Sequence, residues 1–267
     1  MPHTTLPCSP SKSAESHASK SAKDARRRRR ELRRIRSLPV STSAAALEDD
    51  TPPSLRRKTS YGKISVVGRR REMHDAVAVE LGFLKRDGQS YDFFGVFEGH
   101  RVGLACRERL AEIVGEETDQ RRREWEEVMR EAFQKVAALM GLGSVAVVGE
   151  TEVVVAGSKA VLCRGGEAVR LLESEEEEAE QVKVRGVRRS GEDEFLILGS
   201  DGFWDVISDD LPYQIATRYC ATPLDDGAEK AVAVMAEMAL ALGSKHNVSV
   251  VLVDLRKPNA SQQSGFM

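Results

Sequence analysis

This chain of 267 residues is poor in aromatic residues and cysteine, and it has no long apolar run. Phe, Trp and Tyr together make up 5% of the residues. No stretch is apolar for long enough to cross a bilayer, which argues against an integral membrane protein. The N-terminus also lacks the apolar segment of a secretory signal. We therefore expect a soluble protein that is not secreted.

The cysteines are few, and their spacing fits neither a disulfide framework nor a zinc site. The four thiols include no CxxC pair, and they are Cys8, Cys106, Cys163 and Cys220. Residues this far apart, one of them near the N-terminus, are typical of a protein in a reducing compartment.

The net charge of −2 hides a strong asymmetry between two parts of the chain. Residues 1–58 contain 14 Lys and Arg against 6 Asp and Glu, whereas the remaining residues contain 26 Lys and Arg against 36 Asp and Glu. The first 58 residues are rich in Ser, Ala, Arg and Pro and nearly free of aromatics. Because that composition cannot bury enough apolar surface to fold, we expect a disordered basic arm at 1–58, a folded domain at 59–257 and a polar tail at 258–267.

The densest part of the arm is Arg26–Arg36, which reads RRRRRELRRIR. It resembles a basic nuclear-import cluster, so the sequence predicts a protein of the nucleus, the cytoplasm or both. A solvated charge run without a specific role is the alternative, and the Ser-rich, acid-poor start leaves an organellar transit peptide open. No aromatic residues are interleaved with the arginines, which argues against nucleic-acid binding.

From residue 60 onward, short runs rich in Val and Phe alternate with longer helical patterns. The runs predict strands at Tyr91–Phe97, Ser144–Val148, Glu152–Ala156, Lys159–Cys163, Glu167–Leu172, Glu194–Gly199 and Val248–Asp254. The segments at 149–151 and 164–166 predict hairpin turns, so these strands pair antiparallel. Helices are expected near Val102–Val114, Gln120–Met140 and Asp226–Leu242. The pattern predicts an α+β domain with layers.

Acidic residues and histidines gather at the ends of these strands. All three histidines beyond the arm fall in such segments, which contain His74-Asp75, Glu98-Gly99-His100, Asp201-Gly202 and His246-Asn247. Strand ends hold side chains at fixed separations, and hard divalent cations prefer oxygen ligands. The sequence therefore predicts a metal-binding site at one edge of the sheets.

Five ordered segments resemble blocks of the metal-dependent protein phosphatase 2C family, and its plant abscisic-acid-signalling branch in particular. The segments are SVVGRRREMHDAVAVE, FFGVFEGHRVG, AVLCRGGEAVRL, DEFLILGSDGFWDVIS and HNVSVVLVDL. The resemblance implies an αββα sandwich, in which two antiparallel sheets are flanked by helices. It also implies a pair of Mg²⁺ or Mn²⁺ ions, and hydrolysis of phosphoserine and phosphothreonine in phosphorylated protein substrates.

The resemblance also implies roles for individual residues. Arg70 corresponds to the arginine that grips the phosphate, and His100 to a proton donor. The metal ligands correspond to Asp75, Glu98, the carbonyl of Gly99, Asp201 and the residue at position 246, which here is His246.

The chain departs from the family pattern at several of these positions. The family's aspartate at position 98 is a glutamate here, and two of its acids are replaced by His74 and His246. Its glycine pair is Arg101-Val102, and its Gly-Asp-Ser-Arg-Ala is reduced to Ala156–Ala160. Several dozen residues are missing after Leu172, so part of the central and flap region is absent.

Three hypotheses follow from these departures. The first is a phosphatase 2C-like protein with weakened or lost metal binding and impaired catalysis, which acts by binding phosphoproteins or signalling partners. The second is an active phosphatase with an altered metal preference, since imidazole suits Mn²⁺ better than Mg²⁺. The third is a shortened chain without a stable fold. For a folded protein we expect a monomer.

Overall fold

The computed structural model describes residues 59–86, 88–98, 113–114, 124–137, 143–157, 159–172, 183–221 and 226–256. The predicted arm and tail lie outside the described residues, so the domain boundaries at 58 and 257 stay predictions. Gly99, His100 and nearly all of the helix expected at Val102–Val114 also lie outside them. Within the described ranges, no helix has the length and hydropathy needed to cross a membrane.

In the described part of the chain, ten strands form two five-stranded antiparallel sheets. The first sheet has the order β1 (Ser60–Val66), β10 (Val248–Asp254), β9 (Asp193–Gly199), β6 (Ala160–Arg164) and β7 (Glu167–Leu172). The second has the order β2 (Ala76–Arg86), β3 (Gln89–Phe97), β4 (Gly143–Val148), β5 (Glu152–Gly157) and β8 (Val184–Arg188).

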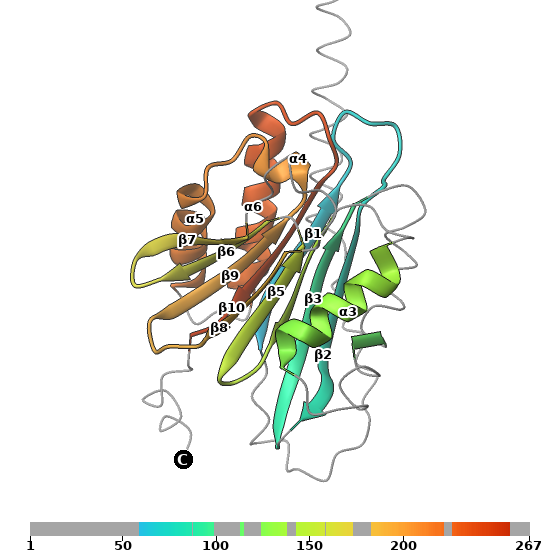
Figure 1. The fold of residues 1–267 in the computed structure, drawn as a ribbon. Coiled ribbons are helices and arrows are strands. Elements are labelled where there is room, and N and C mark those ends of the chain that lie inside the picture. Colours follow the sequence, from blue (N-terminus) through green and yellow to red (C-terminus); the bar gives the residue numbers. More distant parts are fainter. Residues whose placement is uncertain are drawn as a thin grey trace, which may run out of the picture. The chain divides into compact units, whose positions relative to one another are not determined.

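Helices cover the outer face of each sheet. On the first sheet lie α5 (Asp210–Cys220) and α6 (Gly227–Ala241), and on the second lies α3 (Trp125–Ala137). A short helix, α4 (Asp201–Trp204), follows β9 directly. Figure 1 shows the resulting order of layers, helix, sheet, sheet, helix. The predicted αββα sandwich is confirmed.

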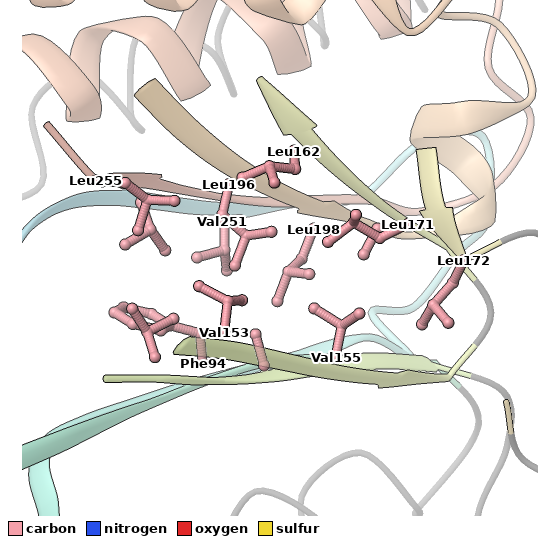
Figure 2. Close-up of a cluster of buried hydrophobic side chains, with 14 of the residues drawn as sticks. Phe94, Val153, Val155, Leu162, Leu171, Leu172, Leu196, Leu198, Val251 and Leu255 are labelled. Carbon is pink, nitrogen blue, oxygen red and sulfur yellow. The ribbon is translucent and has the colours of Figure 1, made fainter. Parts of the chain in front are cut away.

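The main core lies between the two sheets. Figure 2 shows side chains of the first sheet, such as Leu198 and Val251, facing Phe94, Val153 and Val155 of the second. These five side chains are at most 1% exposed. A separate cluster fills the space between the second sheet and α3. Each sheet packs one face against the opposite sheet and its second face against helices. Both faces of a strand therefore need apolar residues, which explains the nearly continuous Val runs in the sequence.

Both predicted hairpin turns are present. Residues 149–151 join β4 to the antiparallel β5, and Gly165-Gly166 join β6 to the antiparallel β7. The two glycines have φ of 59° and 89°, which is the left-handed conformation that a tight two-residue hairpin requires.

Several elements were not predicted, among them β8, β2 and α5. The edge strand β8 reads VRGVR and has mostly exposed side chains, so neither alternation nor a Val run reveals it. The long β2 contains Glu80, Gly82 and Lys85 and is interrupted by a bulge between Glu80 and Leu84. The helix α5 begins in the polar segment around Asp210, where no apolar stripe stands out. In each case tertiary pairing, rather than the local pattern, defines the element.

A glycine in β1 allows α6 to approach the first sheet closely. A Cβ at Gly62 would stand 2.1 Å from the carbonyl oxygen of Ala228, in the first turn of α6. Both groups belong to the backbone, so neither can rotate away.

We therefore expect Gly62→Ala to lower the free energy of unfolding by about 1–3 kcal/mol, as forced overpacking does elsewhere. Urea unfolding followed by circular dichroism measures this. Gly191→Ala is the matched control, because a Cβ at Gly191 would meet no atom within 4 Å. Equal losses in the two variants would show that the β1–α6 contact is not tight.

Two buried thiols report on whether this fold forms in solution. Cys163 and Cys220 are free and buried. Burial raises the pKa of Cys163 to about 12, helped by Glu194, and raises that of Cys220 to about 11. Since only the thiolate reacts, both should resist iodoacetamide near about pH 8 and react once urea is added.

Peptide mass spectrometry measures this labelling, with Cys8 of the predicted arm as the internal reference expected to react at once. Rapid labelling of Cys163 in the absence of urea would support the hypothesis of a shortened chain without a stable fold.

Candidate functional site

The candidate site lies at one end of the sandwich, where loops from both sheets meet. Figure 1 shows α4, the β1–β2 loop and the α6–β10 loop together at this end. Five predicted site residues lie there: Arg70 and Asp75 in the β1–β2 loop, Glu98 after β3, Asp201 at the start of α4 and His246 before β10. Strand ends of two sheets thus bring together residues up to 176 positions apart in the sequence.

Glu98 and Asp201 join the two sheets at this end. Glu98 Oε1 accepts a hydrogen bond of 2.9 Å from the backbone N–H of Asp201. Burial, together with the charges of Asp201, Asp75 and Asp205, raises the pKa of Glu98 to about 8. The hydrogen bond from Asp201 lowers this pKa by a smaller amount. The pKa of Asp201 is also raised, by burial and by Asp205. Burial and the neighbouring acids therefore favour the protonated form of Glu98 near neutral pH.

Asp75 is positioned from the first sheet by serines. Its Oδ2 accepts a hydrogen bond of 2.9 Å from Ser249 Oγ, which lies 2.7 Å from Ser65 Oγ. Burial raises the pKa of Asp75, and hydrogen bonds to Ser249 and Ser200 and the charge of Arg70 oppose this rise. The serines thus hold an acidic side chain at a fixed place, half-buried, next to Arg70.

Arg70 contacts the imidazole of His246. The distance from Arg70 Nη2 to His246 Nδ1 is 2.7 Å. Because a guanidinium has only donors, Nδ1 is the acceptor of this hydrogen bond. A fixed positive charge therefore lies directly beside His246.

Close backbone contacts hold the two loops against each other. A Cβ at Gly68 would stand 1.8 Å from the carbonyl oxygen of His246, and one at Gly202 would stand 2.0 Å from that of Asn247. Asn247 Nδ2 donates a hydrogen bond of 3.1 Å to the carbonyl of Glu72. The loop with Arg70 is therefore anchored at both ends on the segment with His246.

A model of the protein phosphatase 2C family matches residues 178–248. "Probable protein phosphatase 2C 54" of Arabidopsis thaliana is 32% identical over 228 residues, covering 75% of this chain and 74% of the relative. The chain belongs to the protein phosphatase 2C family. "Probable protein phosphatase 2C 8" of Oryza sativa subsp. japonica is 30% identical, covering 77% of this chain and 78% of the relative.

Solved structures agree with this fold. The chain is similar to a C. elegans sex determining protein, with a TM-score of 0.60 and 16% identity over 76% of this chain and 66% of that one. It is also similar to a serine-threonine phosphatase 2C from Toxoplasma gondii, with a TM-score of 0.52 and 17% identity over 73% of this chain and 94% of that one. Both matches support the phosphatase 2C architecture.

Three acidic side chains, those of Asp75, Glu98 and Asp201, come together where a phosphatase 2C enzyme is expected to hold two cations. The carboxylates of Asp75, Glu98 and Asp201 are suitable donors for one hard cation. Among the described side chains, however, no group of three or more His, Cys, Asp or Glu is arranged to hold a metal ion. One oxygen of Glu98 is occupied by the N–H of Asp201, and the guanidinium of Arg70 lies at the imidazole of His246.

The structure adds Asp205, which the sequence patterns did not indicate, and it shows the contacts of Asn247 and His74. Asp205 raises the pKa of both Glu98 and Asp201, and its position four residues after Asp201, at helical spacing, was the available signal. Asn247 has a buried Oδ1 without a partner in the described part of the chain, so an unsatisfied acceptor lies at this site. His74 lies 3.9 Å from Glu72, within the arginine loop. The roles assigned to Gly99 and His100 fall outside the described residues.

Proposed function

We propose that this phosphatase 2C relative binds phosphorylated proteins or signalling partners at the candidate site and has impaired catalysis. The supporting observation is the contact of 2.7 Å between Arg70 and His246. A guanidinium binds phosphate oxygens with paired hydrogen bonds, and Arg70 is exposed. A phosphorylated side chain can therefore reach Arg70 without a rearrangement of the core.

Impaired catalysis follows from charge and length at two positions. His246 supplies no negative charge, and Arg70 beside it adds a positive one, so a second cation is repelled. Glu98 is one methylene longer than the aspartate of the family pattern, which displaces any ion that it binds. A displacement of about 1 Å can lower a rate about a hundredfold.

Slow hydrolysis with an altered metal preference is the second candidate function. It is supported by the carboxyl groups of Asp75, Glu98 and Asp201, which gather at one sheet edge, where the negative charge of Asp201 repels those of Asp75 and Glu98. A single ion such as Mn²⁺ would relieve that repulsion. Imidazole ligands favour Mn²⁺ over Mg²⁺, so the dependence on each metal distinguishes this candidate.

The test is phosphate release from a phosphothreonine peptide by the full chain, with Mn²⁺ and Mg²⁺ titrated separately. We expect the unaltered chain to release no more phosphate in the presence of metal than the Asp201→Ala variant does. The sample must be folded, which the protection of Cys163 and Cys220 from iodoacetamide shows. Metal-dependent turnover that Asp201→Ala abolishes would overturn impaired catalysis and establish the second candidate.

Placement of the protein in the cell also stays a proposal. The import cluster Arg26–Arg36 lies outside the described residues. We expect a fluorescent fusion of the full chain to enter the nucleus, and a fusion with the arginines of this cluster changed to Gln to stay in the cytoplasm. The monomeric state is likewise a prediction, which light scattering tests.

A further inference from the structure

Four exposed basic side chains lie in the two loops that form the candidate site. Arg69, Arg70 and Arg71 follow one another in the β1–β2 loop, and Lys245 precedes His246 in the α6–β10 loop. The two loops contact each other through Asn247 and Glu72 and through Arg70 and His246. Figure 1 shows them at the same end of the sandwich. We call Arg69, Arg71 and Lys245 the basic rim.

The basic rim is not neutralised by the described part of the chain. Other basic side chains have acidic partners, at distances of 3.1 Å for Lys159–Asp209, 2.6 Å for Arg170–Asp209, 2.7 Å for Lys230–Asp226 and 2.6 Å for Arg256–Asp254. Among the described residues, no carboxylate forms an ion pair with a rim residue. Three positive charges therefore face solvent within the loops that frame Arg70.

One residue of the rim, Arg69, lies at the carboxyl end of α6. Arg69 Nη2 lies 3.9 Å from the place where a Cβ on Gly243 would stand, directly after the last turn of α6. That turn is closed by hydrogen bonds from Gly243 N to Leu240 O at 3.2 Å and from Ser244 N to Ala239 O at 3.1 Å. The carboxyl end of a helix attracts cations, so Arg69 has a preferred position there. A charged surface with a fixed backbone loses less entropy when it binds a ligand.

We propose that the basic rim is a second anion subsite, which binds an acidic or phosphorylated residue that flanks the phosphoresidue at Arg70. The inference rests on the proposed function, because it adds a specificity element to the same phosphopeptide. Arg69 and Arg71 are the immediate neighbours of Arg70 in the chain, so an acidic group next to the phosphoresidue on a bound peptide can reach their side chains. Guanidinium groups and an ammonium suit phosphate and carboxylate partners.

The test measures binding of three fluorescein-labelled peptides to the full chain by anisotropy. All contain one phosphothreonine, and its flanking residues are neutral in the first, aspartate in the second and phosphoserine in the third. The rim variant is Arg69→Gln, Arg71→Gln and Lys245→Gln combined. The matched control is Lys63→Gln, Arg130→Gln and Arg218→Gln, which removes the same charge from exposed positions on β1, α3 and α5.

We expect the unaltered chain to bind the acidic and doubly phosphorylated peptides at least about tenfold more tightly than the neutral one, with a steeper dependence on salt. The rim variant should lose this preference and change affinity for the neutral peptide less than about twofold, whereas the control should keep the preference. Binding of all three peptides with equal affinity would overturn the second subsite and leave the proposed function intact.

Two further results would also overturn the inference. One is an equal loss of preference in the control, which would show a general charge effect. The other is a result in which no phosphopeptide binds, the unaltered chain binds anionic vesicles of phosphatidylserine, and the rim variant does not bind these vesicles. That second result would overturn the proposed function as well and assign the surface to a membrane.

Discussion

Glu98→Asp combined with His246→Asp is expected to raise Mn²⁺-dependent hydrolysis of a phosphothreonine peptide by about a hundredfold or more over the unaltered chain. The first change shortens the carboxylate that lies 2.9 Å from the backbone N–H of Asp201. The second replaces the imidazole beside Arg70 with a carboxylate. Each added or repositioned carboxylate gives a hard cation a ligand that it prefers.

The matched control for this gain is Glu98→Asp with His246→Asn. It has the same side-chain sizes as the test variant but one negative charge less, so we expect it to bind Mn²⁺ more weakly and to turn over more slowly than the test variant. Calorimetry with Mn²⁺ measures metal binding, and phosphate release measures turnover. A test variant that binds Mn²⁺ no better than its control would show that charge at position 246 does not limit the site.

Leu198→Ala is expected to lower the free energy of unfolding by about 2–5 kcal/mol, because it leaves a cavity in the layer between the two sheets. Leu198 lies on β9, is 0% exposed and faces the second sheet in Figure 2. It pairs across the strands with Ala160 and Val251, so the surrounding backbone is held on both sides and cannot close the cavity.

Leu81→Ala makes the same chemical change at a side chain that is 42% exposed. We expect it to cost less than about 1 kcal/mol. Thermal or urea unfolding of the two variants gives the comparison. Similar losses, or a chain without a cooperative transition, would contradict a packed core between the sheets and favour the hypothesis of a shortened, unstable product.

The sequence was sufficient for the layers of this fold and for the residues that gather at one edge. Apolar runs such as Glu194–Gly199 and Val248–Asp254 form central strands, and the glycines at 165–166 close a hairpin. The resemblance to phosphatase 2C supplied the arrangement of two sheets between outer helices, which local sequence patterns do not reveal. Arg70, Asp75, Glu98, Asp201 and His246 then fall at one end because that is where the strands end.

Contacts between distant segments could not be predicted. The edge strand β8 exists because its backbone pairs with β5, and its arginines and glycine hide it in the sequence. The contact of Arg70 with His246 depends on Gly68, which allows the β1–β2 loop to touch the α6–β10 loop. Asn247 was expected near the metal site, but its hydrogen bond to Glu72, which anchors the arginine loop, could not be predicted.

The most direct test of the proposed function is isothermal titration of a phosphothreonine peptide into the full chain in Mn²⁺ buffer. We expect saturable binding, no continuing heat of hydrolysis, and a loss of at least about tenfold in affinity for Arg70→Gln but not for Lys63→Gln. A continuing heat with release of phosphate would contradict impaired catalysis. Equal binding by the Arg70→Gln variant would contradict the assignment of Arg70 as the phosphate-binding residue.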